Sequence, residues 1–404
     1  MVAAALFINY IDRGALPQTV DLMQSDLHLT IDQIAALTSA FFWPYALSQM
    51  PVGWLAERYG AQRVLAAAVG LWAIATLLFG LTSSVTVLIL LRVLLGFGES
   101  AAFPCASVVL AQCVPVQSLG RANGVTAVGY LIAPAFGMYF GGRLVEHDYG
   151  SWLADHQRWR VPFVVFGALS LLWLWPWLNT RIAPVGHTLP VEESGTSPSF
   201  GMILRQRALW GAGIGHFMSN YTFYFMLSWL PFYLVTERGF SHAEMTAMVW
   251  PALLLNGVGG YVGGWFIDRW MQRGASASLA YKTTLFLGSG GAIVCMLAIG
   301  LGDRMSALIA IYVFQFLCGV GSPGVFAVSQ IFAGPRATAR WVGIQNSLGN
   351  MAGIVGPPMT AYIVKVTGHF QDAFLLGAVV ATCAVLSYVV LMPKLEPIQW
   401  AHGK

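Results

Sequence analysis

Four charged residues lie within long apolar stretches of the sequence, where charge is rare. Asp12 and Arg13 are adjacent, whereas Arg92 and Glu99 are seven residues apart, so a helix would place this second pair on one face, about 10 Å apart. A charged side chain at the centre of a membrane helix costs about 2.5 to 3.5 kcal/mol, which predicts that all four face a polar interior. Two cations and two carboxylates in such a place are suited to binding an anion and exchanging protons.

The composition predicts that lipid surrounds these charges. Of the 404 residues, 57% are hydrophobic and 9% are charged, whereas a soluble domain carries about 25% charged residues. A formal net charge of +4 also excludes an electrostatic nucleic-acid binder. Because the apolar stretches are long and do not alternate, they favour helices over barrel strands. We therefore expect an all-α integral membrane protein.

Windows of about 20 apolar residues predict twelve transmembrane helices. The polar stretch 181–208 is rich in Pro, Gly and Ser and is expected to be a linker. It separates an N-terminal six-helix half, 1–180, from a C-terminal half, 209–404. The predicted spans are 1–24, 33–56, 64–83, 86–111, 121–144, 161–179, 209–234, 244–267, 279–301, 306–332, 341–364 and 372–393.

Lys and Arg are distributed unevenly between the two ends of this bundle. Thirteen are expected at the end that holds the linker. The opposite end has six, which are Arg143, Arg158, Arg160, Arg238, Arg304 and Lys365. Because cytoplasmic loops carry an excess of Lys and Arg, we expect the linker and both termini in the cytoplasm. The chain is predicted to be a multi-pass protein of the inner (plasma) membrane of a bacterium.

The two halves resemble each other in sequence. At an offset of 211, Asn9-Tyr10 corresponds to Asn220-Tyr221, and Glu57 corresponds to Asp268. At an offset of 219, Arg121 corresponds to Arg340. An internal duplication is therefore predicted, and paired six-helix halves are typical of transporters whose site lies at the interface between them.

The four membrane-depth charges occur in one half only. The positions that correspond to Asp12, Arg13, Arg92 and Glu99 hold Phe223, Tyr224, Gln315 and Ser322. This asymmetry favours a charged coupling half that faces a neutral, substrate-shaping half. An anion that engaged Arg13 or Arg92 would leave a carboxylate less compensated and so promote its protonation. The alternative is a static ion-pair network that locks spans 1–24 and 86–111 together.

The loops after the second and eighth spans carry related motifs. The first reads GWLAERYGAQR and the second reads GGWFIDRWMQRG. The first matches G-x-x-x-(D/E)-R-x-G-x-x-R and resembles the signature of the major facilitator superfamily; the second resembles its weakened copy. Such a loop is suited to a conformational latch of charge pairs, although its charges could instead only set topology. The latch candidates are Gly53, Glu57, Arg58, Arg63, Asp268 and Arg269.

Five segments carry a narrower pattern, which reads INYIDR, SQMPVGWLAERYG, LRVLLGFGESAAFP, GHFMSNYTFYFMLSWLPFYL and GIQNSLGNMAGIVGP. Together they resemble the anion:cation symporter family over nearly the whole chain. The resemblance implies a monomeric transporter with the major facilitator fold that takes up an organic anion, such as a sugar acid, with protons. It also implies that Arg13 and Arg92 organise the anion site, while Asp12 and Glu99 carry the coupling protons.

Five neutral residues are further candidates for substrate binding. Tyr45 and Tyr130 could donate hydrogen bonds to an anion, but could equally be packing residues. His216 could contact substrate or protons, or be a satisfied core histidine. Asn220 and Asn346 resemble pocket positions of the family; the alternative is hydrogen bonding between helices without substrate contact.

The remaining sequence features argue against other classes of function. There is no phosphate-binding G-x-x-x-x-G-K-(S/T) loop, no cluster of metal ligands and no nucleophile constellation, so we expect no cofactor, no metal and no enzymatic activity. The expected coupling ion is H⁺. A proton-linked efflux antiporter of lipophilic or cationic compounds is the alternative function, but it has no use for two membrane-depth arginines.

Overall fold

The computed structural model describes residues 1–180 and 197–400, without the side chains of a few helical residues, Asp12 among them. The described chain is helical. In order, its helices are α1 (Val2–Leu27), α2 (Ile31–Tyr59), α3 (Ala61–Leu81), α4 (Val85–Glu99), α5 (Ala102–Cys113), α6 (Leu119–Glu146), α7 (Arg160–Asn179), α8 (Phe200–Leu204), α9 (Arg207–Thr236), α10 (His242–Gln272), α11 (Ala277–Leu301), α12 (Arg304–Thr367) and α13 (Phe370–Leu386). Most of the expected linker, 181–196, lies outside the described residues.

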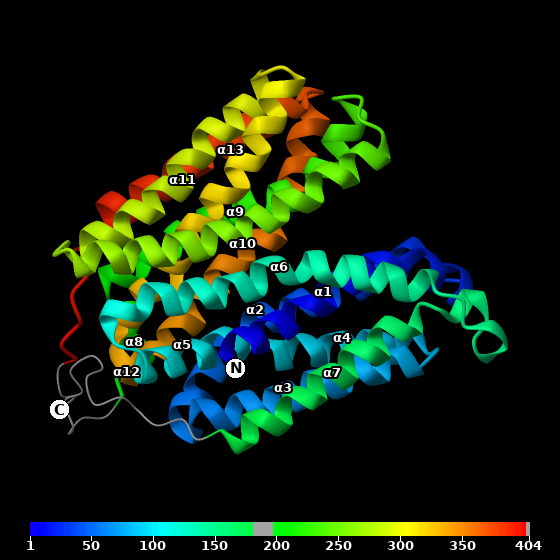
Figure 1. The fold of residues 1–404 in the computed structure, drawn as a ribbon, viewed down its shortest axis with the longest axis horizontal. Coiled ribbons are helices and arrows are strands. Elements are labelled where there is room, and N and C mark those ends of the chain that lie inside the picture. Colours follow the sequence, from blue (N-terminus) through cyan, green and yellow to red (C-terminus); the bar gives the residue numbers. More distant parts are fainter. Residues whose placement is uncertain (181–196, 401–404) are drawn as a thin grey trace.

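The helices form two halves, α1 to α7 and α9 to α13, as Figure 1 shows. The halves meet at the end from which the linker departs and spread apart toward the opposite end (Figure 1). We call these the linker end and the far end. Twelve helical spans occur in the described residues when the five-residue α8 is left out, α4 and α5 count as one, and α12 counts as two. The all-helical arrangement of twelve spans in two halves, expected from the sequence, is confirmed (Figure 1).

Hydropathy alone identifies fewer of these spans. In the described part of the chain, seven segments are long and apolar enough to cross a membrane, and one of them is the 64-residue α12. α1, α2, α9 and α10 have 26 to 31 residues each but are not among the seven. These helices carry polar residues such as Arg13, Gln49 and His216, which lower their mean hydropathy.

The structure interrupts the predicted span 86–111. α4 ends at Glu99 and α5 begins at Ala102. Pro104 has no N–H to offer the carbonyl four residues earlier, at Ser100, so one helical hydrogen bond is missing at the junction. At the same junction the Ser100 hydroxyl donates to the carbonyl of Phe97 at 2.6 Å. The interruption puts Glu99 at a helix terminus inside the bundle.

The predicted spans 306–332 and 341–364 are joined without a loop. Both lie in α12, which is divided into two arms at Gly334, where φ is 66°. Glycine adopts this left-handed value readily because it has no Cβ, and Pro335 follows it. The first arm thus leads directly into the second at the linker end.

Each half has its own apolar core, and the two halves touch at the linker end. Trp72, Phe79 and Phe163 are buried in the N-terminal core, and Phe225 and Phe374 in a C-terminal one. At the interface, a Cβ on Gly53 of α2 would overlap the carbonyl oxygen of Ala339 in α12. A Cβ on Gly124 of α6 would lie 2.8 Å from the carbonyl oxygen of Gly260 in α10. Backbone contact between the halves therefore depends on glycine.

Candidate transport site

A cavity of about 450 Å³ lies between the two halves. The N-terminal half contributes Tyr10, Arg13, Phe103 and Tyr130 to its wall. Among the described residues that line the cavity, Arg13 is the only Lys, Arg, Asp or Glu. The polar side chains of the opposite wall include His216, Ser219, Asn220, Tyr224, Ser289, Ser322, Asn346 and Asn350. The cavity thus has one charged wall and one neutral wall.

Arg13 is held by an acid and by aromatic rings. Its Nε and Nη2 donate to the same oxygen of Glu99, Oε2, at 3.1 and 2.9 Å. Its guanidinium lies 4.2 Å from the ring centroid of Tyr10 and 4.4 Å from that of Tyr45, distances at which a cation is attracted to an aromatic face. The Glu99 side chain is 0% exposed, and its Oε1 has no hydrogen-bond partner in the described part of the chain. The pair therefore includes a buried carboxylate oxygen that is not satisfied.

Local structure explains why Glu99 reaches Arg13. Gly96 lets α4 approach α2 so closely that a Cβ would overlap the carbonyl oxygen of Phe41. Glu99 then lies at the last residue of α4, with its side chain buried. Arg13 offsets the cost of burying this charge, because an ion pair with good hydrogen bonds is the usual way to keep a buried charge.

Two predicted anion-binding residues, Arg92 and Tyr45, do not line the cavity. Arg92 is buried, donates from Nε to the carbonyl of Leu37 at 3.2 Å and lies 5.1 Å from the Phe41 ring centroid. Tyr45 is buried under the Arg13 guanidinium. The side chain of Asp12 lies outside the described residues. Of the three predicted charges whose side chains the structure describes, it thus brings Arg13 to the cavity surface and places Glu99 directly behind it.

Tyr130 lines the N-terminal wall, and the neutral wall holds the remaining three predicted side chains. Asn220 donates from Nδ2 to the carbonyl of Gly349 at 3.1 Å. His216 and Asn346 are 4% and 3% exposed, and neither His216 Nδ1 nor Asn346 Nδ2 has a partner among the described residues. Asn220 is therefore committed to the backbone and His216 partly so, through a hydrogen bond with the Gln345 backbone, whereas Asn346 Nδ2 and His216 Nδ1 have no partner among the described residues.

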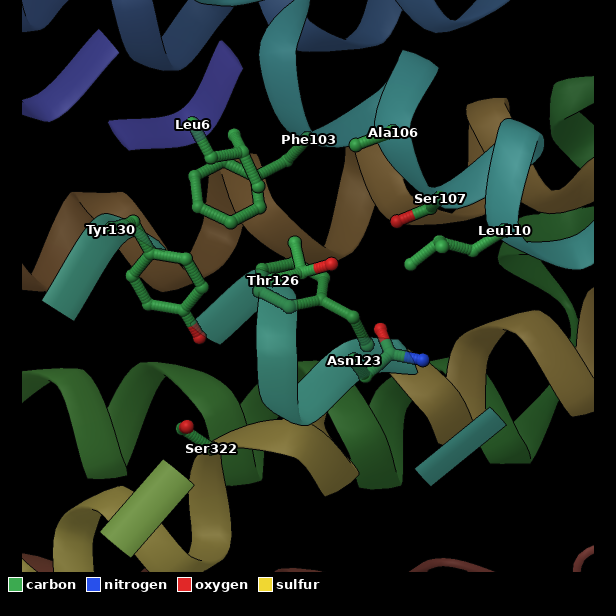
Figure 2. A pocket seen from close by; sticks show the side chains of 10 residues that line it. Leu6, Phe103, Ala106, Ser107, Leu110, Asn123, Thr126, Tyr130 and Ser322 are labelled. Atoms are coloured by element: carbon green, nitrogen blue, oxygen red, sulfur yellow. The ribbon is translucent and has the colours of Figure 1, made fainter. Parts of the chain in front are cut away.

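The floor of the cavity is aromatic, and of its residues only Tyr130 was among the candidates predicted from the sequence. Phe103 stacks on Phe326 of the opposite half with ring centroids 4.7 Å apart. Tyr10 lies 6.0 Å from Phe103, and Tyr130 lies 5.2 Å from it. Figure 2 shows Phe103, Tyr130 and Ser322 around a small pocket below this layer. The only sequence signal was the position of Tyr10, one helical turn before Arg13.

Below the floor, an amide pair joins the halves. Asn123 Nδ2 donates to Gln330 Oε1 at 2.8 Å, and Gln330 Nε2 donates back to Asn123 Oδ1 at 3.2 Å. Asn123 lines the same small pocket as Thr126 (Figure 2). Both amides are buried, so this reciprocal pair closes the space between the cavity and the linker end.

At the linker end, two acids cross from one half to the other. Glu57 of α2 forms an ion pair with Arg340, at 2.7 Å between Oε2 and Nε, and its Oε1 accepts from the Arg340 backbone amide at 3.0 Å. Asp268 of α10 accepts from the backbone amides of Gly120 and Arg121, both at 2.9 Å, and from Arg121 Nε at 3.1 Å. Asp268 therefore meets the positive N-terminus of α6 as well as a guanidinium.

These pairs differ from a latch contained in the motif loops. In the described residues, the structure gives no ion pair to Arg58, Arg63 or Arg269, and all three are exposed; Arg58 packs 5.1 Å from the Trp54 ring centroid. The basic partners are Arg121 and Arg340. Their correspondence at an offset of 219 was the one sequence signal that could have identified them.

Burial also changes the protonation of the two acids, which lie just beyond the predicted spans 33–56 and 244–267. Burial raises the pKa of Glu57 to about 7, although the backbone amide and the guanidinium of Arg340 lower it. Burial raises the pKa of Asp268 too, against the lowering effect of its hydrogen bonds from Arg121 and Gly120. Among the described residues, no group of three His, Cys, Asp or Glu is placed to hold a metal ion.

The sequence matches the family model of the Major Facilitator Superfamily over residues 2–334. The chain belongs to this superfamily. The probable galactarate/D-glucarate transporter GudP of Bacillus subtilis (strain 168) is 29% identical over 97% of this chain and 90% of its own length. The hexuronate transporter of the same organism is 28% identical over 95% and 92%.

Solved structures share the fold. The Escherichia coli fucose:proton symporter FucP superposes with a TM-score of 0.78 over 96% of each chain, at 15% identity. Membership of the superfamily makes this chain a multi-pass membrane protein and a secondary transporter, not an enzyme. The names of its relatives agree with the resemblance to the anion:cation symporter family.

Proposed function

We propose that the protein is a proton-coupled symporter that takes up an organic anion through the cavity between its halves. The observation that carries this proposal is the Arg13–Glu99 pair, in which the single cation of the described lining is held by a fully buried acid. The relatives named as galactarate/D-glucarate and hexuronate transporters support an organic acid as substrate.

Coupling follows from charge balance at this pair. Arg13 and Glu99 together carry no net charge. An anion that binds the guanidinium weakens its hold on Glu99, and a proton on the buried carboxylate then restores neutrality. Removal of the anion restores the ion pair and expels the proton. Asp12 is the second expected proton-linked acid, and Arg92 is expected to support the anion site from behind.

Alternating access would use the contacts at the linker end. For the cavity to open there, the Glu57–Arg340 and Asp268–Arg121 pairs and the Asn123–Gln330 amide pair must separate. We infer that this end and both termini face the cytoplasm, in accord with its excess of Lys and Arg. The conformation described here would then face outward. The halves 1–180 and 209–404 would rock about the site, with 181–208 as their linker.

The test is anion-dependent proton movement in proteoliposomes that contain a trapped pH dye, with protein-free liposomes as the control for passive entry of weak acids. D-Galacturonate, 4-hydroxybenzoate and D-glucarate are the probe anions. We expect at least one to cause protein-dependent proton influx. Proton efflux on addition of a lipophilic cation, without influx on addition of any acid, would instead support the efflux antiporter. Arg13 in the cavity argues against that outcome, because it repels a cation.

Glu99→Gln separates coupling from binding. We expect this variant to exchange internal for external anion but to lose accumulation driven by a pH gradient, because Gln cannot take up the proton. Asp12→Asn tests the second acid in the same way. Glu146→Gln, an exposed acid at the end of α6, is the matched control and should accumulate normally. Full pH-driven accumulation by Glu99→Gln would refute coupling through this residue.

A further inference from the structure

The distribution of charge around the cavity limits the substrate beyond the general class of organic anion. Arg13 lies on one wall, and the described part of the opposite wall has no Lys or Arg. His216 lies on that wall, and it forms no ion pair with an acid in the described residues. A second carboxylate placed against this wall would be desolvated without a cation, which is strongly unfavourable. The site therefore fits one anionic group at one end.

The space between the two walls is built from rings in series. Tyr10, beside Arg13, is followed by Phe103 at 6.0 Å, Phe326 at 4.7 Å and His216 at 5.5 Å between successive centroids. This series crosses from the N-terminal half to the C-terminal half. Aromatic floors of this kind stack against the faces of flat or apolar-sided rings. A cavity of about 450 Å³ is within the size range of sites for single small molecules.

The neutral end of this series offers hydrogen bonds that nothing in the described protein uses. Asn346 Nδ2 and His216 Nδ1 are buried without partners among the described residues, although the His216 ring has a hydrogen bond with the Gln345 backbone; a buried polar group left unpaired is unfavourable. The neighbouring amides are already engaged, since Asn220 donates to Gly349 and Asn350 accepts from Tyr224 at 2.9 Å. A neutral polar group on the substrate would relieve the cost at His216 and Asn346.

Building on the proposed function, we propose that the substrate is a ring-containing monocarboxylate with an uncharged polar group, a hydroxyl or carbonyl, across the ring from its carboxylate. The carboxylate binds Arg13, the ring lies on Phe103 and Phe326, and the neutral group meets His216 and Asn346. Uronic acids and hydroxylated aromatic acids both have this chemistry. Open-chain dicarboxylates do not.

The test is binding to the purified full-length protein, measured calorimetrically at pH 7 with four acids. D-Galacturonate and 4-hydroxybenzoate represent the two sources of the proposed chemistry, benzoate lacks the neutral group, and D-glucarate carries a second carboxylate. We expect D-galacturonate, 4-hydroxybenzoate or both to bind at least about tenfold more tightly than benzoate and D-glucarate. The tighter of the two identifies the source. Equal or tighter binding of benzoate or D-glucarate overturns the proposal.

Variants of Asn346 and His216 test whether these residues bind the neutral polar group of the substrate. Asn346→Leu and His216→Phe should each reduce the advantage of the hydroxylated acid over its unhydroxylated partner, while the affinity for benzoate changes little. Thr360→Val is the matched control, because Thr360 is a buried polar residue of the same arm of α12 that does not line the cavity. An undiminished advantage in both folded variants would contradict the assignment.

The outcomes separate this inference from the proposed function. D-Glucarate that binds best and drives proton influx would overturn the inference and leave the symporter intact. If none of the four acids binds or moves protons, the proposed function fails and the inference fails with it.

Discussion

The two halves share a framework but differ at the cavity. On the N-terminal side, Arg13 and Glu99 form an ion pair, with 2.9 Å between Nη2 and Oε2. At the corresponding C-terminal positions, Tyr224 and Ser322 line the cavity without charge. The comparison teaches that a duplicated scaffold can retain its helix arrangement while only one copy carries ionisable chemistry. A buried ion pair responds strongly to an added anion or proton, whereas a neutral wall mainly selects by shape and hydrogen bonding.

The halves are more alike at the linker end. Each supplies one acid, Glu57 or Asp268, and each acid reaches an arginine of the other half. The two acids are not equivalent, because Asp268 accepts hydrogen bonds from two backbone amides whereas Glu57 accepts a hydrogen bond from one. The acids that close the linker end thus occur in both halves, whereas the ion pair at the cavity occurs in the N-terminal half.

The largest expected effect is removal of the charged wall. Arg13→Ala takes away the cation and leaves Glu99 buried and unpaired. Breaking a buried ion pair in this way lowers folding stability by about 3 to 5 kcal/mol. We expect anion affinity to fall by more than about 100-fold in a binding titration. Arg143→Ala, an exposed arginine at the far end, is the control. Unchanged affinity in Arg13→Ala would mean that the pair only locks helices together.

The second expected effect compares the two acids at the linker end. Asp268→Asn weakens three hydrogen bonds to a charged group, so closure should weaken by about 2 kcal/mol, or about 30-fold in the ratio of closed to open molecules. Glu57→Gln should not weaken closure at pH 7, because the closed form favours the uncharged state of this side chain. The ratio can be measured from distances between spin labels at the exposed positions Arg63 and Arg273. The reverse order of the two variants would show that the amide contacts at α6 contribute little.

The third effect depends on pH. The pKa of Glu57 is about 7 in the closed form, against about 4.3 for an exposed glutamate. Because the closed form has the higher pKa, protonation favours closure: this stabilisation is complete below about pH 4 and is lost as the pH rises through 7. From pH 8 to pH 6, the closed-to-open ratio should rise about tenfold in the same labelled protein. Glu57→Gln should remove the dependence, and a rise toward the open form at pH 6 would contradict the sign.

The smallest expected effect adds charge to the neutral wall. Tyr224→Arg places a cation at the position that corresponds to Arg13, so binding of the dianion D-glucarate should improve by about fivefold relative to a monocarboxylate. Tyr224→Phe, which also loses the hydrogen bond to Asn350, is the control for that loss. An unchanged preference in a folded Tyr224→Arg protein would show that the neutrality of this wall does not set selectivity.

Much of the fold could be predicted from the sequence because lipid imposes strict rules. Long apolar segments must be helical, and their number, the duplication and the motif around Glu57 were sufficient for the major facilitator fold. The break after Glu99 was not predicted, because hydropathy does not detect a helix interruption between apolar segments. Pro104 was the available signal.

The sequence alone determined the membrane environment, the two-half architecture and the presence of scarce charges in one half. Only the tertiary structure decided that Arg13 faces the cavity while Arg92 lies behind it, that Arg121 and Arg340 are the partners of the acids, and that Phe103 stacks on Phe326. The physical reason is that a helix surrounded by apolar neighbours and lipid has a weak amphipathic signal. Its rotation, and its register against the other half, are set by packing contacts between residues far apart in the chain.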